Sequence, residues 1–344
     1  MDDINKKILE MLLLEARTPL TQIAKKCKIA TPSIHSRIKE MKKKGIINGA
    51  IMQLNPQKLG FTCCGVLQII TIPGKEEKVR NYLRGRQYSF YDYKYFGKLH
   101  IGTTFALPTI KGLANLINQI KTNPEVKEVN TLIWHDLIDM DHPENLVLSK
   151  KINTQKSRTE HKSINKEPTE TRANTDFMVQ KDDNNPIVLS RKDVKIAKIL
   201  VENAQTPFSR IAKQVGIAPN SVITRYKRLK KEKVISYSSI TINLEKLDYQ
   251  AMVVIFFKAS QASNSLMLYN QVIQEPNVIV AIRSVGFYDL MIILPAKNIS
   301  EIFELKEKFY KIRGIEKIEV EIHAPYTRWP LNMFPALLNK KQAV

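Results

Sequence analysis

Two short basic segments carry the residue types best suited to binding a polyanion. The segment TPSIHSRIKEMKKKGII, residues 31–47, is followed 188 positions later by the similar PNSVITRYKRLKKEKVI, residues 219–235. In each segment apolar residues recur at helical spacing on one side, and lysines and arginines occupy the other. A cationic helix face is often only a solvated surface. Because charge and apolar stripe recur together in a second copy, the pattern favours phosphate binding over solvation alone.

Contacts to phosphates and to base edges need different side chains. Lysine and arginine neutralise phosphates, and short polar side chains in the first turns of a recognition helix reach the bases. In the first helix the candidates are Thr31, Ser33, His35, Ser36, Arg37, Lys39, Lys42 and Lys43. In the second helix they are Asn220, Ser221, Thr224, Arg225, Arg228 and Lys231. For the two serines, capping of the helix start is an equally good interpretation.

Shorter helical segments precede each basic helix and must position it. A helix over residues 5–16 is predicted to stop at Thr18-Pro19, and its copy stops at Thr206-Pro207. A second helix and a short turn then lead into the basic helix, which is the helix-turn-helix arrangement that places a recognition helix in the major groove of double-stranded DNA. Alternating residues at 51–55 and 240–244 predict a wing or a linking strand.

Beyond this strand each copy changes to the order strand, helix, strand, strand, helix, strand. This order is typical of the ferredoxin-like α+β sandwich. The predicted fold class is therefore α+β, with two winged helix-turn-helix domains that are each followed by a ferredoxin-like sandwich domain. The expected divisions are 1–60 and 189–248 for the DNA-binding domains, 61–140 and 249–325 for the ferredoxin-like domains, 141–188 for a flexible polar linker and 326–344 for a tail.

The net charge of +21 is concentrated on the two helical units. Residues 1–60 hold 12 lysines and arginines against 5 acids, and residues 191–248 hold 13 against 5, whereas residues 61–140 hold 10 against 7. A charge bias that served only solubility would be spread along the chain. Its concentration indicates a contact surface for nucleic acid.

Composition argues against several other classes. The longest apolar runs have the length of strands, far below the ~20 residues of a membrane helix, and the start MDDINKK is unlike a signal peptide. A cytoplasmic protein is expected. The three cysteines and six histidines show no metal spacing, so neither a metal nor a cofactor is predicted, apart from a small-molecule effector such as an amino acid.

Both halves resemble the Lrp/AsnC family of feast/famine transcription regulators. The most specific local matches are Ile-Ala-x-x-Ser-[Val/Ile]-x-x-Arg, ending at Arg37 and Arg225, and Val285-Gly286-Phe287-Tyr288-Asp289. The second stretch is similar to the family's Gly-x-Tyr-Asp turn, which implies that Gly286, Tyr288 and Asp289 are candidates for an amino-acid effector site. The alternative is that these residues serve the turn alone. The first half departs from the pattern, because His100 stands where the family has Asp.

The sequence leaves two other functions open. Siroheme decarboxylase subunits resemble the same two-domain chain, but the Asn- and Trp-containing strand segment on which they look to rely is missing, so the chain is expected not to be an enzyme. A low-specificity DNA-coating protein is the other alternative.

Because the two ferredoxin-like domains share one chain at high effective concentration, we expect them to pair as an intramolecular pseudo-dimer, followed by homo-oligomers. Unlike recognition helices then predict an operator with unlike half-sites.

Overall fold

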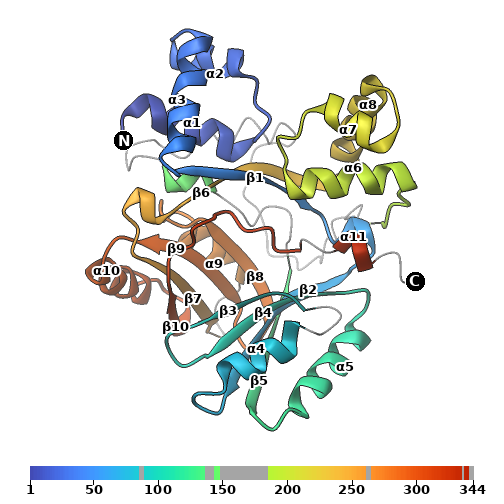
Figure 1. Cartoon of the computed structure of the whole chain (residues 1–344). Coiled ribbons are helices and arrows are strands. Elements are labelled where there is room, and N and C mark those ends of the chain that lie inside the picture. Colours follow the sequence, from blue (N-terminus) through green and yellow to red (C-terminus); the bar gives the residue numbers. More distant parts are fainter. Residues whose placement is uncertain (85–88, 136–142, 148–184, 261–264, 335–336, 341–344) are drawn as a thin grey trace, which may run out of the picture.

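A computed structural model describes residues 1–84, 89–135, 143–147, 185–260, 265–334 and 337–340 (Figure 1). Most of the predicted linker, residues 148–184, lies outside the described residues. The described part contains two copies of one plan, and the predicted α+β class is confirmed. In the described part no helix combines the length and the apolar character that crossing a membrane requires.

Each copy begins with three helices, which together with the strand that follows form what we call the first and the second module. The first module consists of α1 (Asp3–Leu14), α2 (Leu20–Cys27), α3 (Thr31–Lys43) and β1 (Ile47–Leu54). The second module consists of α6 (Arg191–Glu202), α7 (Phe208–Val215), α8 (Pro219–Lys231) and β6 (Ile235–Ile242). The apolar stripes predicted from the spacing are buried, including Ile8, Ile34, Ile196 and Val222, which are 0% exposed.

The turn between the second and third helices needs a left-handed residue in both modules. Gly216 supplies it in the second module with φ 73°, and glycine adopts this conformation without steric cost. Lys28 supplies it in the first module with φ 56°, although a Cβ disfavours this region. The turn geometry therefore persists even where its favoured residue has been replaced.

The strand after each basic helix links the two modules. Strands β1 and β6 pair antiparallel with each other, from Ile47 opposite Ile242 to Leu54 opposite Ile235. This two-stranded ribbon runs beneath the helices of both modules, and the modules lie side by side at one end of the molecule (Figure 1). Of the two possibilities that the sequence left open, a linking strand is thus the one observed. It holds the two recognition helices on one support.

The ferredoxin-like halves form a single eight-stranded sheet with the order β10-β7-β9-β8-β5-β2-β4-β3. The first half contributes β2 (Cys63–Thr71), α4 (Glu76–Arg84), β3 (Ser89–Lys94), β4 (Ile101–Leu107), α5 (Ile110–Lys121) and β5 (Val126–Trp134). The second half contributes β7 (Ala251–Ala259), α9 (Ser265–Val272), β8 (Val280–Gly286), β9 (Leu290–Ala296), α10 (Ile299–Tyr310) and β10 (Ile315–His323). The remaining elements are short, namely η1 (Gln57–Leu59), η2 (Pro143–Leu146), η3 (Glu245–Leu247) and α11 (Leu337–Lys340).

Two seams join the halves. At the first seam β5 pairs with β8, where Leu132 lies opposite Gly286. At the second seam Phe96, just after β3, forms an antiparallel bridge with Ile322 of β10. Strands β3 and β10 are the two outer strands of the sheet, so this bridge closes the sheet on itself. The predicted pairing of the two halves within one chain is confirmed by these contacts and by the β1–β6 ribbon.

Alternation along the strands separates the inside of this closed sheet from its helical coat. In β7, Val253, Ile255 and Phe257 pack against α9 and α10, whereas Val254 and Phe256 belong to the interior core. The interior core continues into the two modules, because the residues of the β1–β6 ribbon belong to it as well. The recognition helices are therefore mounted on the same apolar core as the sheet.

The tail, to which the sequence assigned no role, packs along this core. Trp329, which is 2% exposed, forms an antiparallel bridge with Ile242 of the ribbon. Farther along, Asn332 donates its Nδ2 hydrogen to the Met52 carbonyl at 3.3 Å, and the Phe334 ring lies 6.0 Å from that of Trp134. The tail thus connects the second half, the ribbon and the first half.

Candidate nucleic-acid interface

All eight candidates of the first basic segment lie on α3. Six of them are exposed, namely Ser33, His35, Ser36, Lys39, Lys42 and Lys43. Thr31 and Arg37 are half-buried. The exposed residues include candidates for base contacts in the first turns and for phosphate contacts farther along, whereas the candidates Thr31 and Arg37 are less accessible. The helix therefore offers one polar, cationic face to solvent while Ile34 and Met41 face the core.

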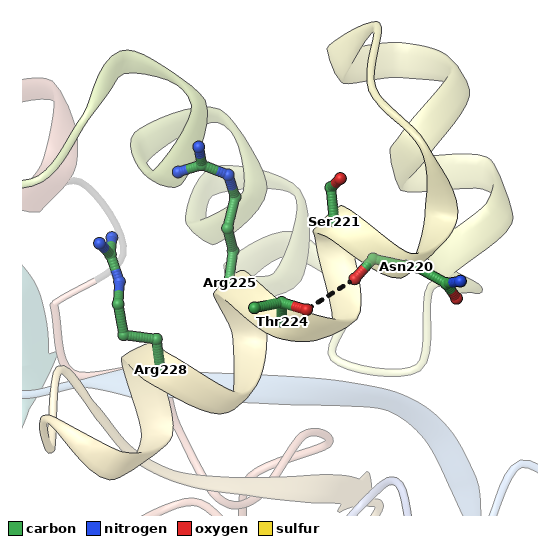
Figure 2. A pocket seen from close by; sticks show the side chains of 5 residues that line it. All are labelled: Asn220, Ser221, Thr224, Arg225 and Arg228. Carbon is green, nitrogen blue, oxygen red and sulfur yellow. Dashed lines mark hydrogen bonds between the residues drawn. The ribbon is translucent and has the colours of Figure 1, made fainter.

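The second set lies on α8 and is shown in Figure 2. Asn220, Ser221, Thr224, Arg225 and Arg228 line one surface hollow of about 430 Å³. The Thr224 hydroxyl donates a hydrogen bond to the Asn220 carbonyl at 3.0 Å, which orients its oxygen along the helix. Lys231, the last residue of the helix, is also exposed. Short polar groups and guanidinium groups therefore surround one open space of a size that can admit an anion.

The arginine at the end of each motif is tied to the first helix of its own module. Arg225 Nη1 lies 2.8 Å from Asp193 Oδ1 and 3.1 Å from Ser190 Oγ. In the first module Arg37 Nη1 lies 2.6 Å from Asp2 Oδ2 and 3.1 Å from Asn5 Oδ1. The contacted positions correspond, because each pair sits at the N-cap and three residues beyond it.

The acid differs in place and in burial between the modules. Asp193 is 0% exposed, receives a second arginine, Arg228, at 2.6 Å, and forms a capping box with Ser190. Burial alone would raise the pKa of Asp193, but the hydrogen bonds from Ser190 and Arg225 and the charge of Arg228 outweigh it, so the pKa lies below its ordinary value. Asp2 is 52% exposed. The second recognition helix is therefore anchored more firmly than the first.

Asp193 was not among the residues predicted from the sequence. A capping box, Ser-x-x-Asp at residues 190–193, is a recognisable signal for a helix start. That signal predicts the start of α6 and says nothing about arginines 32 and 35 positions away. The predicted alternative role of Ser33 and Ser221 is also resolved. Both basic helices begin after an alanine with no side-chain cap, so neither serine is a helix cap.

The residues predicted to bind an effector lie at the first seam. A Cβ on Gly286, with φ 143°, would come 2.1 Å from the carbonyl oxygen of Thr131, so glycine is required for the close approach of β5. Tyr288 is 2% exposed, stacks on Phe256 at 5.3 Å and donates to Glu319 at 3.3 Å. Gly286 thus allows strands of different halves to approach closely, and Tyr288 anchors the turn within the second half.

Asp289 and its counterpart His100 do the same structural work. Asp289 Oδ2 accepts the backbone N–H of Ala259, at the end of β7, at 2.8 Å. His100 Nδ1 accepts the backbone N–H of Thr71, at the end of β2, at 3.1 Å. The equivalence explains how a histidine can replace the family's aspartate in the first half. Among the described residues no three His, Cys, Asp or Glu side chains are grouped so as to hold a metal ion.

Comparison with known proteins agrees with this geometry. Residues 1–48 match a family model described as winged helix-turn-helix DNA-binding, and residues 189–230 match the AsnC-type helix-turn-helix domain. The chain is 30% identical over 140 residues to the regulatory protein AsnC of Haemophilus influenzae, covering 39% of this chain and 90% of that protein. The chain belongs to the Lrp/AsnC family. The transcriptional regulator LrpA of Pyrococcus horikoshii, another Lrp/AsnC relative, is 39% identical over 84 residues, which are 24% of this chain and 60% of LrpA.

A whole-length likeness corrects one expectation. The siroheme decarboxylase NirDL matches 99% of both chains with a TM-score of 0.60 at 15% identity, and its complex with an iron-uroporphyrin III analogue matches with 0.59 at 14%. The expectation that this Lrp/AsnC chain is not an enzyme is therefore overturned, since an enzyme shares its complete tandem fold. That expectation rested on a missing local motif, and at 15% identity local motifs change while an architecture persists.

Proposed function

We propose that this chain is a sequence-specific, DNA-binding transcriptional regulator that reads DNA with both recognition helices at once. The observation that carries the proposal is the joining of two helix-turn-helix modules by the β1–β6 ribbon, with the polar and cationic faces of α3 and α8 left exposed. Membership of the Lrp/AsnC family and similarity to regulators such as AsnC support it. A single chain then has two contact surfaces where an ordinary member needs two chains.

The ion pairs refine the proposed roles. Lys39, Lys42, Lys43 and Lys231 are exposed and suit phosphate contacts. Ser33, His35, Ser36, Asn220, Ser221 and Thr224 lie in the first turns and suit base contacts. Arg37 and Arg225 are held by acids of their own modules, so we assign them to the orientation of the helices.

Salt dependence of DNA binding tests the proposal. In the doubly substituted Lys42→Ala/Lys43→Ala protein, each lost phosphate contact should flatten the slope of log K against log salt by about 0.9, and binding should weaken on all sequences alike. The matched control is Lys111→Ala/Lys121→Ala, which removes the same charge from exposed positions on α5. Equal slopes for the wild-type protein and both variants would contradict the assignment of α3 as a DNA-contacting helix.

We further propose that this chain senses an amino-acid effector through Gly286, Tyr288 and Asp289 of the second half. Support comes from their place at a seam between the halves and from the carboxylate of Asp289, which could accept the ligand's ammonium group. His100 offers no carboxylate in the first half, so at most one such site is expected per chain. Calorimetric titration with a panel of amino acids would contradict the proposal by finding two equivalent sites, or binding that Asp289→Ala leaves unchanged.

Catalysis on a tetrapyrrole is a second candidate function, favoured by the whole-length likeness to a siroheme decarboxylase. The described part of the closed sheet's interior contains the buried rings of Phe256, Tyr288 and Tyr95, which contact one another. Addition of an iron-uroporphyrin to the purified chain separates the two functions. A shifted absorbance band together with loss of a substrate carboxyl group would favour the enzyme. Sequence-specific retention of DNA without such a band would favour the regulator.

A further inference from the structure

The two modules touch through the turn that follows the first helix of each. The backbone N–H of Ala16 donates to the carbonyl of Ser238, and the N–H of Ala204 donates to the carbonyl of Ala50, both at 3.2 Å. The four residues occupy matching positions of the repeat, 188 residues apart. The backbones of the two modules are therefore related by a pseudo-twofold axis that passes through this contact.

The side chain of Arg17, in the first module, makes contacts to the second module that do not follow this pseudo-twofold symmetry. Its Nη1 donates to the carbonyls of Ala204 and of Thr206, the latter at 2.9 Å. Its guanidinium carbon lies 4.0 Å from the centre of the Phe208 ring and 5.7 Å from that of Tyr226. Arg17 is half-buried. A cation–π contact at a partly desolvated site stabilises a protein more than the same contact on an exposed surface, because water screens the charge less.

Gln205 occupies the position matching Arg17 and makes only part of this contact. Its Nε2 donates to the carbonyl of Ala16 at 2.9 Å, which corresponds to the bond from Arg17 to Ala204. Leu20 and Ile38 occupy the positions that match the two aromatic residues. The uncharged amide therefore faces the aliphatic module, and the guanidinium faces the aromatic one.

An ion pair shows the same one-sidedness. Lys230, near the end of α8, lies 2.5 Å from Glu15 of the first module, and Glu15 also accepts the hydroxyl hydrogen of Ser238. The residue that matches Glu15 is Asn203, which cannot form an ion pair. Two independent contacts are thus complete when a first module meets a second module.

We infer that Arg17 is a positioning residue that makes the DNA-binding modules pair first with second and not like with like. Two first modules would bring two Arg17 side chains together at the axis, each facing Leu20 and Ile38 without an aromatic ring. Two second modules would leave Lys230 opposite Asn203. The pairing is independent of DNA; its consequence for operator reading, a fixed pair of unlike recognition helices, rests on the proposed function.

Hydrogen exchange of the full chain without DNA tests the contact directly. In Arg17→Gln, amides of residues 15–18 and 203–206 should exchange about tenfold faster, since the partly buried cation–π contact and the charge on both hydrogen bonds are lost, and glutamine can restore only the bond to Ala204. Strands β2 and β7 should keep their protection, which shows that the protein remains folded. Lys26→Gln is the matched control, because it removes an exposed charge from α2 of the same module.

A swapped variant tests the preference for unlike modules. In Arg17→Gln/Gln205→Arg the guanidinium would face Leu20 and Ile38, so exchange should stay as fast as in Arg17→Gln. Wild-type exchange rates in Arg17→Gln, or their full recovery in the swap, would overturn the inference.

A separate experiment measures DNA binding as the spacing between the two half-sites is changed. Moving two half-sites apart by about 5 base pairs, half a helical turn, should weaken the wild-type protein far more than Arg17→Gln. Equal tolerance of the new spacing in both proteins would overturn the inference. Absence of sequence-specific binding by the wild-type protein would contradict the proposed function instead, and the exchange rates would still decide on Arg17.

Discussion

At the scale of single residues, each recognition helix is oriented by an acid that lies outside it. Asp193 and Asp2 hold Arg225 and Arg37 in equivalent ways, but Asp193 is fully buried and Asp2 is half-exposed. An exposed ion pair contributes little to stability, whereas loss of a buried, hydrogen-bonded acid leaves its partners unsatisfied. The two modules should therefore respond differently to the same substitution.

We expect Asp193→Asn to lower the free energy of unfolding by about 2 kcal/mol at pH 7, and Asp2→Asn to lower it by less than about 1 kcal/mol. The pKa of Asp193 is lowered in the folded protein, so its contribution is present above its unfolded value of about 3.9 and is lost as the pH falls through its folded value. Urea unfolding at pH 7 and near pH 3 measures both effects. A difference between wild type and Asp193→Asn that persists unchanged at the lower pH would contradict this account.

Glu321 should show the opposite pH dependence. Burial, and secondarily the charge of Glu319, raise its pKa to about 7, while its Oε1 accepts the N–H of Leu99 at 2.9 Å at the second seam. The folded protein keeps this proton after the unfolded chain has released it, so stability falls between about pH 4.5 and 7. Glu321→Gln should therefore stabilise the chain by roughly 2 kcal/mol at pH 8 and by little at pH 4. Thermal unfolding across this range checks it, and equal effects at both pH values would refute it.

At the scale of elements, the turn before the recognition helix offers a clean comparison. A Cβ on Gly216 would meet no atom within 4 Å, so Gly216→Ala should cost only the left-handed backbone strain, about 1 kcal/mol. Lys28→Gly, which removes that strain from the first module, should stabilise by up to about 1 kcal/mol. Denaturant unfolding of both variants gives the signs. Destabilisation by Lys28→Gly would show that the Lys28 side chain contributes more than its backbone costs.

The order of the elements could be predicted from the sequence because each one carries a local signal. Apolar spacing predicts α3 and α8, and a strand-length apolar run predicts β7, whose Val253 and Val254 face opposite sides. The pairing of β1 with β6 could not be predicted, since a strand's alternation does not name its partner. The tail was missed for a related reason. Trp329 and Phe334 lie in a short segment that Pro330 interrupts, and they are buried against surfaces formed by distant strands.

Only the exposed residues of the candidate site could be predicted from the sequence, and the buried residues that hold them could not. Lysines on one face of α3 are visible as a periodic pattern, whereas the link from Arg225 to Asp193 joins residues 32 positions apart through the fold. The same limit applies to Asp289, for which the sequence offered both a ligand contact and a turn role. Its bond to the end of β7, matched by His100 at the end of β2, needs the packed sheet to be recognised.

At the scale of the whole molecule, one chain does what a symmetric pair of chains would otherwise do. The backbones of the two copies are related by a pseudo-twofold axis at the two seams, in the ribbon and at the contact between the modules. The side chains at the matching positions Arg17 and Gln205 differ. Duplication within a chain frees each copy from the requirement that both partners be identical. A molecule of this kind can hold two different recognition helices in a constant relation, which a true homodimer cannot.

Selection of binding sites from random double-stranded DNA with the full chain, at one fixed salt concentration, tests the central claim most directly. The account predicts enrichment of a bipartite site whose two halves differ in sequence and lie about one helical turn apart, because α3 and α8 present different first-turn residues. Recovery of a strictly palindromic site, or no enrichment over the starting pool, would contradict it.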